Sequence, residues 1–173
     1  NYVELRNELL SKGYIFNSNT DTEVILYSFI EWGPNCLEKF NGMWAFCIYD
    51  REANKLFLCR DRYGNKPIYY YLNDNSFIFS SEIEPILSAI KYKPQPNQQI
   101  IFDYLVFNRT DHSNQTFFKN IYKLEHGGYI SLDLDPNKDY YKNIPWESTK
   151  IHSNESIILK GKWYDLKKEV SKS

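Results

Sequence analysis

The sequence lacks most features that mark metal-binding, disulfide-bonded, membrane or nucleic-acid-binding proteins. Its three cysteines, Cys36, Cys47 and Cys59, match no zinc-binding spacing and are an odd number for a disulfide framework, so we predict buried, reduced thiols. Lysine and arginine total 21 against 22 acidic residues, without the basic excess of a nucleic-acid-binding protein. The apolar runs are shorter than the ~18 residues of a membrane span, and the charged residues 1–10 do not resemble a signal peptide. We therefore expect a cytoplasmic protein that binds neither membranes nor nucleic acids.

Glycine is scarce, with seven residues, and the sequence contains no glycine-rich phosphate-binding loop. The three histidines, His112, His126 and His152, lie in predicted loops without the paired spacing of metal ligands, so we expect no metal site. The Arg60-Asp61-Arg62 triplet follows a predicted strand, and its simplest interpretation is a turn braced by a salt bridge.

Apolar side chains are abundant, since 42% of the residues are hydrophobic and 17% are aromatic, enough for one packed domain. Periodicity and end signals predict helices over residues 2–12, 20–30, 82–89 and 98–108. Strands are predicted over residues 43–49, 55–59, 68–72, 76–80, 121–124, 128–134 and 157–159. Residues 14–16 are expected to be extended, a tight turn is expected at 73–75, and the sequence beyond Asp135 is polar and irregular.

The predicted strand at residues 43–49 is apolar on both faces. Trp44, Phe46 and Ile48 alternate with Ala45 and Cys47, so we expect both faces to be covered. Hairpins of this kind between apolar helices suggest a helix–sheet–sheet–helix arrangement of an α+β domain with antiparallel sheets.

A capping box precedes the second predicted helix. Thr20 is placed at the N-cap and Glu23 three residues later, so Asp21 is the first helical residue. A carboxylate at this position stabilises a helix through its dipole by ~0.3–1 kcal/mol. Alternatively, Asp21 at the rim of a buried helix binds the ammonium group of a ligand.

Four segments together carry a family resemblance: TDTEVIL from Thr20, FNGMWAF from Phe40, RDRYGNKPIYY from Arg60 and FSSEI from Phe79. In this order and spacing they closely resemble the amino-terminal glutaminase domain of glutamine-hydrolysing asparagine synthetases, a class II glutamine amidotransferase. The resemblance is strong over residues 2–87 and weaker up to residue 134.

The resemblance implies an N-terminal-nucleophile hydrolase fold, here incomplete at the amino terminus. It divides the chain into a partial amidotransferase domain over residues 1–135 and an irregular segment over 136–173 that leads toward a synthetase domain. In the intact protein, glutamine would supply ammonia for the conversion of aspartate to asparagine. ATP and magnesium would act in the synthetase domain and no cofactor in this one. The partners implied are glutamine, the synthetase domain of the same polypeptide and, in some assemblies, a second copy.

Residue by residue, the resemblance assigns one role within this sequence. Asp21 matches the aspartate that binds the α-amino group of glutamine. The nucleophile of the family is an amino-terminal cysteine whose own α-amino group acts as the base. The sequence given starts at Asn1, so this cysteine is expected upstream of it, and no residue of the chain is assigned as catalytic. Cys36, Cys47 and Cys59 cannot replace it, because none carries a free α-amino group.

Two alternatives remain open. One is a scaffold domain that no longer hydrolyses glutamine, as in relatives such as β-lactam synthetases and lasso-peptide cyclases, which have lost the cysteine. The other is a domain that supplies ammonia to another acceptor, such as a sugar.

Overall fold

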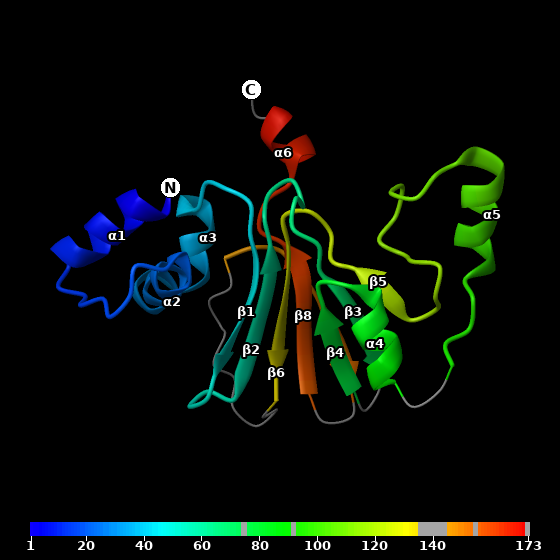
Figure 1. The fold of residues 1–173 in the computed structure, drawn as a ribbon, viewed down its shortest axis with the longest axis horizontal. Helices are drawn as coiled ribbons and strands as arrows, with labels where there is room; N and C mark the ends of the chain where they lie inside the picture. Colours follow the sequence, from blue (N-terminus) through cyan, green and yellow to red (C-terminus); the bar gives the residue numbers. More distant parts are fainter. Residues whose placement is uncertain (74–75, 91–92, 135–144, 154–155, 172–173) are drawn as a thin grey trace.

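The computed structural model describes residues 1–73, 76–90, 93–134, 145–153 and 156–171 (Figure 1). The helices are α1 (Tyr2–Ser11), α2 (Asp21–Trp32), the 3₁₀ helix η1 (Gly33–Asn35), α3 (Cys36–Lys39), α4 (Ile83–Ala89), α5 (Gln98–Phe107) and α6 (Leu166–Val170). The strands are β1 (Ala45–Asp50), β2 (Lys55–Arg60), β3 (Tyr69–Asn73), β4 (Ser76–Ser80), β5 (Ile121–Lys123), β6 (Gly128–Asp133), β7 (Ser148–Ser153) and β8 (Ser156–Lys162).

The strands form two antiparallel sheets. The larger sheet has the order β1-β2-β6-β8-β7, and the smaller sheet has the order β4-β3-β5. Side chains along each strand alternate between two apolar layers, as the pleat of a strand requires. Phe57 and Cys59 of β2 pack against the helices α1–α3, whereas Leu58 between them packs against the smaller sheet.

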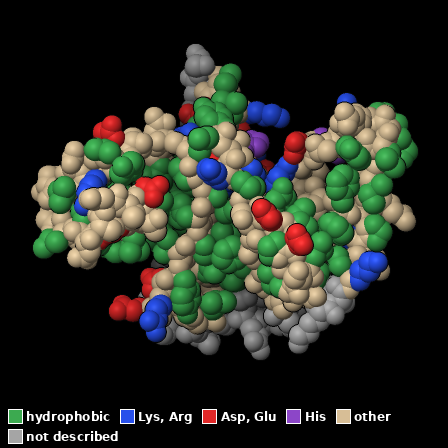
Figure 2. Space-filling model, viewed as in Figure 1, with side chains coloured by type: hydrophobic (Ala, Val, Ile, Leu, Met, Phe, Trp, Pro, Cys, Tyr) green, Lys and Arg blue, Asp and Glu red, His purple; other side chains and the backbone are tan. Residues whose placement is uncertain are grey.

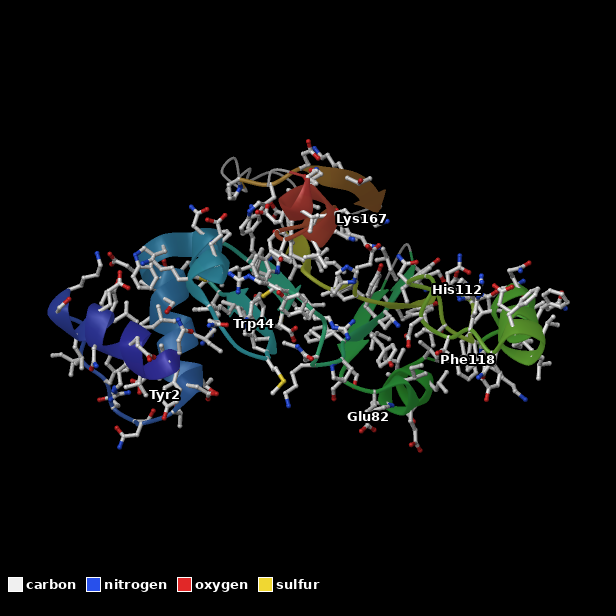
Figure 3. All side chains as sticks on the ribbon, turned by 90° about the horizontal axis from the view of Figure 1, so that it is seen from above. Tyr2, Trp44, Glu82, His112, Phe118 and Lys167 are labelled. Atoms are coloured by element: carbon white, nitrogen blue, oxygen red, sulfur yellow. The ribbon has the colours of Figure 1, made fainter. Side chains whose placement is uncertain are left out.

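Three apolar clusters join the layers. The first lies between α1–α3 and the larger sheet, the second lies between the two sheets, and the third lies between the smaller sheet and α4. The chain is therefore an α+β sandwich with antiparallel sheets, as the sequence predicts. Helix α5 stands apart from the sheets in both views (Figures 1 and 3).

Most predicted elements are confirmed. Helices α1, α4 and α5 and the strands β2 to β6 begin and end within one residue of the predicted positions. Residues 14–16 form no strand; the rings of Tyr14 and Phe16 instead pack on Tyr27 of α2, with centroids 5.1 and 5.0 Å away. The predicted turn at 73–75 includes residues outside the described ranges.

The prediction that strand 43–49 is covered on both faces is confirmed, but the bounds of the strand differ and one of its edges is open. The strand begins two residues later, at Ala45, and lies at the edge of the larger sheet. Its alternation is as predicted, with Trp44 and Phe46 facing the helices and Ala45 and Cys47 facing the smaller sheet. Because one edge of β1 has no neighbouring strand in the described structure, Met43 and Tyr49 remain 65% and 51% exposed.

The strand predicted at residues 157–159 is confirmed as part of the longer strand β8. The rest of the segment after residue 135, predicted to be irregular, contains β7 and α6 where the structure describes it. Strand β8 pairs with β6 from Gly128↔Lys162 to Asp133↔Ile157, and β7 pairs with β8. The sequence of β7 is polar, so it lacks the apolar alternation that identifies a half-buried strand. His152, expected in a loop, belongs to β7. The domain boundary at 135/136 stays a prediction, but strands on both sides of it share one sheet.

Residues 60–66, which we call the Asp61 turn, connect the end of β2 to several other parts of the fold. Asp61 is fully buried, and its carboxylate accepts hydrogen bonds from four backbone N–H groups. The donors are Trp44 (3.3 Å), Tyr63 (3.1 Å), Asn65 (3.0 Å) and Lys66 (3.0 Å). Burial in itself raises the pKa of the Asp61 carboxyl, but the donors outweigh burial and leave the pKa below its ordinary value.

The two arginines of the Asp61 turn bind carbonyl oxygens. Arg60 donates to the carbonyls of Lys66 (2.7 Å), Leu124 (2.6 Å) and Gly64. Arg62 donates to the carbonyls of Glu38 (2.8 Å) and Phe40, and its guanidinium lies 4.9 Å from the ring centre of Trp163. Neither arginine forms an ion pair with Asp61 among the described contacts, so the predicted salt bridge is wrong. The Asp61 carboxylate accepts hydrogen bonds from backbone N–H groups instead.

We expect Asp61→Asn to lower the free energy of unfolding by about 2–4 kcal/mol at pH 7, because it weakens several charge-assisted hydrogen bonds in a buried site. Since the folded pKa of Asp61 is depressed, its contribution is present above the unfolded pKa of ~3.9 and is lost as the pH falls through the lower folded pKa. Urea unfolding between pH 7 and pH 3 tests this. Glu52→Gln, in the exposed β1–β2 turn, is the control. If the free energy of unfolding of Asp61→Asn depends on pH in the same way as that of the original chain, Asp61 does not provide the predicted pH-dependent stability.

We also expect the polypeptide of residues 1–173 to self-associate, because an apolar strand edge is a template for pairing. Tyr49→Lys should shift the population toward monomer in sedimentation velocity experiments, because a lysine at a strand edge opposes pairing. Tyr2→Lys, on the comparably exposed α1, should leave association unchanged. A monomer with strong amide protection over residues 45–50 would show that the sandwich is closed without a further strand.

Candidate functional site

Asp21 is the first residue of α2, as the capping box predicts. The Thr20 hydroxyl accepts a hydrogen bond from the backbone N–H of Glu23 at 3.4 Å. The Glu23 carboxylate accepts from the backbone N–H groups of Asn17 and Ser18, both at 2.8 Å, rather than from Thr20. These bonds, with Asn17 the largest contributor, lower the pKa of Glu23. The loop before α2 is therefore fixed against the helix, and Asp21 has a defined position.

The Asp21 side chain is exposed, and no hydrogen bond or ion pair joins its carboxylate to another described residue. It lies on the wall of a cavity of about 1000 Å³, which we call the large cavity. It also lines a smaller cavity of about 140 Å³ between α1, α2 and residues 40–44. A carboxylate at the junction of two cavities, without a partner of its own, is free to bind a cationic group.

The large cavity is lined by segments far apart in the sequence. They are the first turns of α2, residues 43–49 with β1, residues 66–68 and residues 79–81. Most of its wall is apolar, with Ile25, Leu26 and Phe79 among the lining side chains. Its charged groups are Asp21 and Glu23 on α2 and Lys66 of the Asp61 turn.

Hydrogen bonds at Asn1 position the loop between α3 and β1. The Asn1 side chain accepts from the backbone N–H of Asn41 at 2.8 Å and donates to the Lys39 carbonyl at 3.0 Å. The bond from Trp44 N–H to Asp61 holds the other end of this loop. Residues 40–44 therefore lie as a fixed wall opposite Asp21 (Trp44 is labelled in Figure 3).

Comparison with known proteins identifies the family. A family model described as "Glutamine amidotransferase domain" matches residues 1–142. The chain belongs to this family. It is 38% identical over 167 residues to a putative glutamine-hydrolysing asparagine synthetase 2 of Methanocaldococcus jannaschii, covering 94% of this chain and 32% of that protein. It is 31% identical over 145 residues to glutamine-hydrolysing asparagine synthetase 1 of Bacillus subtilis, covering 82% and 23%. The chain thus spans about a third or less of these relatives.

All four segments that carry the family resemblance contribute to the large cavity of this amidotransferase domain. Thr20–Leu26 supplies Asp21, Phe40–Phe46 supplies the facing wall, Arg60–Tyr70 supplies Lys66, and Phe79–Ile83 supplies Ser80 and Ser81. The structure therefore brings together segments that are up to 60 residues apart in the printed sequence. The sequence predicts Asp21 as a site residue but does not predict Lys66 or Cys47. The position of Lys66 within the Arg60–Tyr70 segment could have indicated it, and so could the position of Cys47 on a strand with alternating faces.

The three cysteines of the amidotransferase domain are free thiols, as predicted. Burial raises the pKa of Cys36 to about 12 and that of Cys47 to about 11, and it raises the pKa of Cys59 well above its ordinary value. Cys47 lines the large cavity, but a thiol with this pKa is almost entirely protonated at neutral pH and is a poor nucleophile.

Among the residues that the structure describes, no group of three or more His, Cys, Asp and Glu side chains is arranged to hold a metal ion. None of the placed helices has the length and apolar character needed to cross a bilayer. His112 and His126 lie in loops, as expected; His112 Nε2 lies 2.8 Å from the Asp103 carboxylate.

We expect the polypeptide of residues 1–173 to release no glutamate from glutamine above the uncatalysed rate. Loss of the nucleophile from a catalytic unit costs several orders of magnitude in rate, and burial raises the pKa of each described thiol, which disfavours the nucleophilic thiolate. A coupled glutamate assay with Cys47→Ser as the paired variant tests this. Turnover at the rate of an intact amidotransferase that disappears in Cys47→Ser would show that Cys47 is recruited as a nucleophile.

Proposed function

We propose that the chain is the glutamine-binding part of an ammonia-supplying domain in an asparagine-synthetase-like amide ligase. The observation that carries the proposal is the position of Asp21. Its unpartnered carboxylate lies in a cavity lined by all four family segments. The α-ammonium of glutamine is a cation that such a carboxylate binds through a charge-assisted hydrogen bond. The apolar wall of α2 and β1 is suited to the methylene groups of the same ligand.

The chemistry follows from the family resemblance. An amino-terminal cysteine of the intact protein would attack the side-chain amide of glutamine, with its α-amino group as the base. Backbone and amide donors would stabilise the oxyanion. The part of this chain is to bind and orient glutamine: Asp21 holds the α-amino end, while the fixed loop at residues 40–44 bounds the site opposite.

The rest of the proposal concerns the longer polypeptide. A synthetase domain on the same chain would bind ATP and magnesium and convert aspartate to asparagine with the ammonia released. The names of the relatives support this, since each describes a glutamine-hydrolysing asparagine synthetase. Cytoplasmic location and a homodimer belong to the same proposal.

The experiment is Asp21→Asn in the full-length protein. We expect the KM for glutamine to rise at least tenfold, equivalent to about 1.4 kcal/mol of lost binding, because the neutral amide no longer pairs with the ammonium. Activity with free ammonia should not change, since ammonia does not use the glutamine site. Steady-state assays with both nitrogen donors provide the comparison.

Thr20→Ala is the matched control, because it removes the helix cap and leaves the carboxylate. It should lower the free energy of unfolding by about 1 kcal/mol with little change in the KM for glutamine. If Asp21→Asn reduces both activities equally, Asp21 acts in folding through the helix dipole. A full-length protein active only with ammonia would indicate the scaffold alternative, and one inactive with aspartate would indicate another acceptor.

A further inference from the structure

A second hollow, which we call the polar hollow, is lined by residues of the Asp61 turn other than Lys66, which lines the large cavity. It has a volume of about 660 Å³ and shares no lining residue with the large cavity. Its walls come from the Asp61 turn, the start of β3, residues 111–114 and residues 123–126. Figure 2 shows basic, acidic and histidine side chains gathered between the sheets and α5, and Figure 3 labels His112 on the same segment.

Arg60 supplies one positive charge to the polar hollow. Its guanidinium is largely buried and donates three hydrogen bonds, all to backbone carbonyls. A guanidinium has five N–H donors, so two form no hydrogen bond to a residue that the structure describes. None of the described ion pairs includes Arg60. Burial lowers the pKa of Arg60, whereas the charge of the neighbouring Asp61, outside the hollow, and that of Asp111, inside it, raise this pKa. Asp61 offsets part of the Arg60 charge, and the remaining positive potential, together with that of Lys123, favours an anion in the adjoining hollow.

Lys123 of β5 supplies a second positive charge. Its ammonium binds the carboxylate of Asp111, whose side chain is 78% exposed and comes from the loop after α5. An ion pair with one exposed partner is weak, so Asp111 is an exchangeable counter-ion. The pair also shows that the position next to Lys123 accepts an oxyanion.

The remaining walls suit an organic group. Tyr63 and Tyr69 line the hollow, and Tyr63 is exposed at its rim. Glu125, the other carboxylate of the hollow, is paired with Lys162 at 2.9 Å. The volume lies within the range of ~300–1,000 Å³ typical of small-molecule sites and far exceeds that of a simple anion.

We propose that the polar hollow binds a small phosphomonoester. Its phosphate replaces the Asp111 carboxylate on Lys123 and lies near Arg60, and its organic group contacts Tyr63 and Tyr69. A dianion interacts more strongly with two cations than the single charge of Asp111 does, which favours the exchange. Arginine and lysine are also the usual phosphate-binding side chains.

The test is isothermal titration of the polypeptide of residues 1–173 with phenyl phosphate and with inorganic phosphate at constant ionic strength. Both should bind saturably, phenyl phosphate more tightly by at least threefold. Lys123→Ala should weaken both at least tenfold. Asp111→Asn should tighten both about threefold to fivefold, because it removes the competing charge. Tyr63→Ala should weaken only phenyl phosphate.

Lys119→Ala is the charge-matched control. Lys119 lies outside the hollow, where it donates to the Gln95 side chain, and its removal should change either affinity less than twofold. If Lys119→Ala and Lys123→Ala weaken ligand binding equally, binding depends only on the overall charge of the protein, and the proposal is overturned. Absence of saturable binding up to millimolar ligand, or weaker binding in Asp111→Asn, would also overturn it. Because Asp111→Asn is expected to gain affinity, misfolding cannot imitate the predicted result.

Discussion

The hydrogen bonds of the buried Asp61 carboxylate connect parts of the chain that the layers alone would leave separate. One oxygen accepts from the N–H groups of Tyr63 and Asn65, and the other accepts from Lys66 and from Trp44, the residue before β1. Its main-chain carbonyl accepts from Gly127 before β6 at 2.8 Å. Gly127 has a φ of +60°, and a side chain there would collide with the Tyr164 carbonyl, so the approach requires glycine. Through its carboxylate and its main-chain carbonyl, Asp61 therefore connects its own turn, the start of β1 and the loop before β6.

Arg60 and Arg62, on either side of Asp61, also connect distant segments, by donating hydrogen bonds to backbone carbonyls. Arg60 binds the carbonyl after β5, and Arg62 binds carbonyls at the end of α3. The Trp163 indole donates to the Arg60 carbonyl at 2.9 Å, which attaches the end of β8. Because these are buried polar groups, each needs a partner, and removal of one leaves others unsatisfied.

The Asp61 turn and the two residues after it contribute to the walls of both cavities. Lys66, Pro67 and Ile68 line the large cavity, whereas Arg60, Tyr63 and Gly64 line the polar hollow. A ligand in either cavity therefore contacts the same rigid segment. On the opposite wall of the large cavity, the capping bonds at Thr20 and Glu23 fix the beginning of α2 and leave the Asp21 carboxylate unpaired. Hydrogen bonds to the local backbone thus make the start of α2 rigid without using the Asp21 carboxylate, which therefore keeps its charge for a ligand.

The sequence by itself determined the helices, most strands, the alternation of their faces and the position of Asp21, because these depend on local periodicity and on capping chemistry between near neighbours. The family segments, too, are continuous stretches that can be recognised without a fold. Only the tertiary structure decided that β1 is an edge strand and that polar β7 extends the larger sheet, since strand order depends on contacts between distant residues. The tertiary structure also decided that Asp61 binds backbone N–H groups instead of its neighbouring arginines. Folding brings these donors to the buried carboxylate, whereas adjacency in the sequence did not bring the arginine side chains to it.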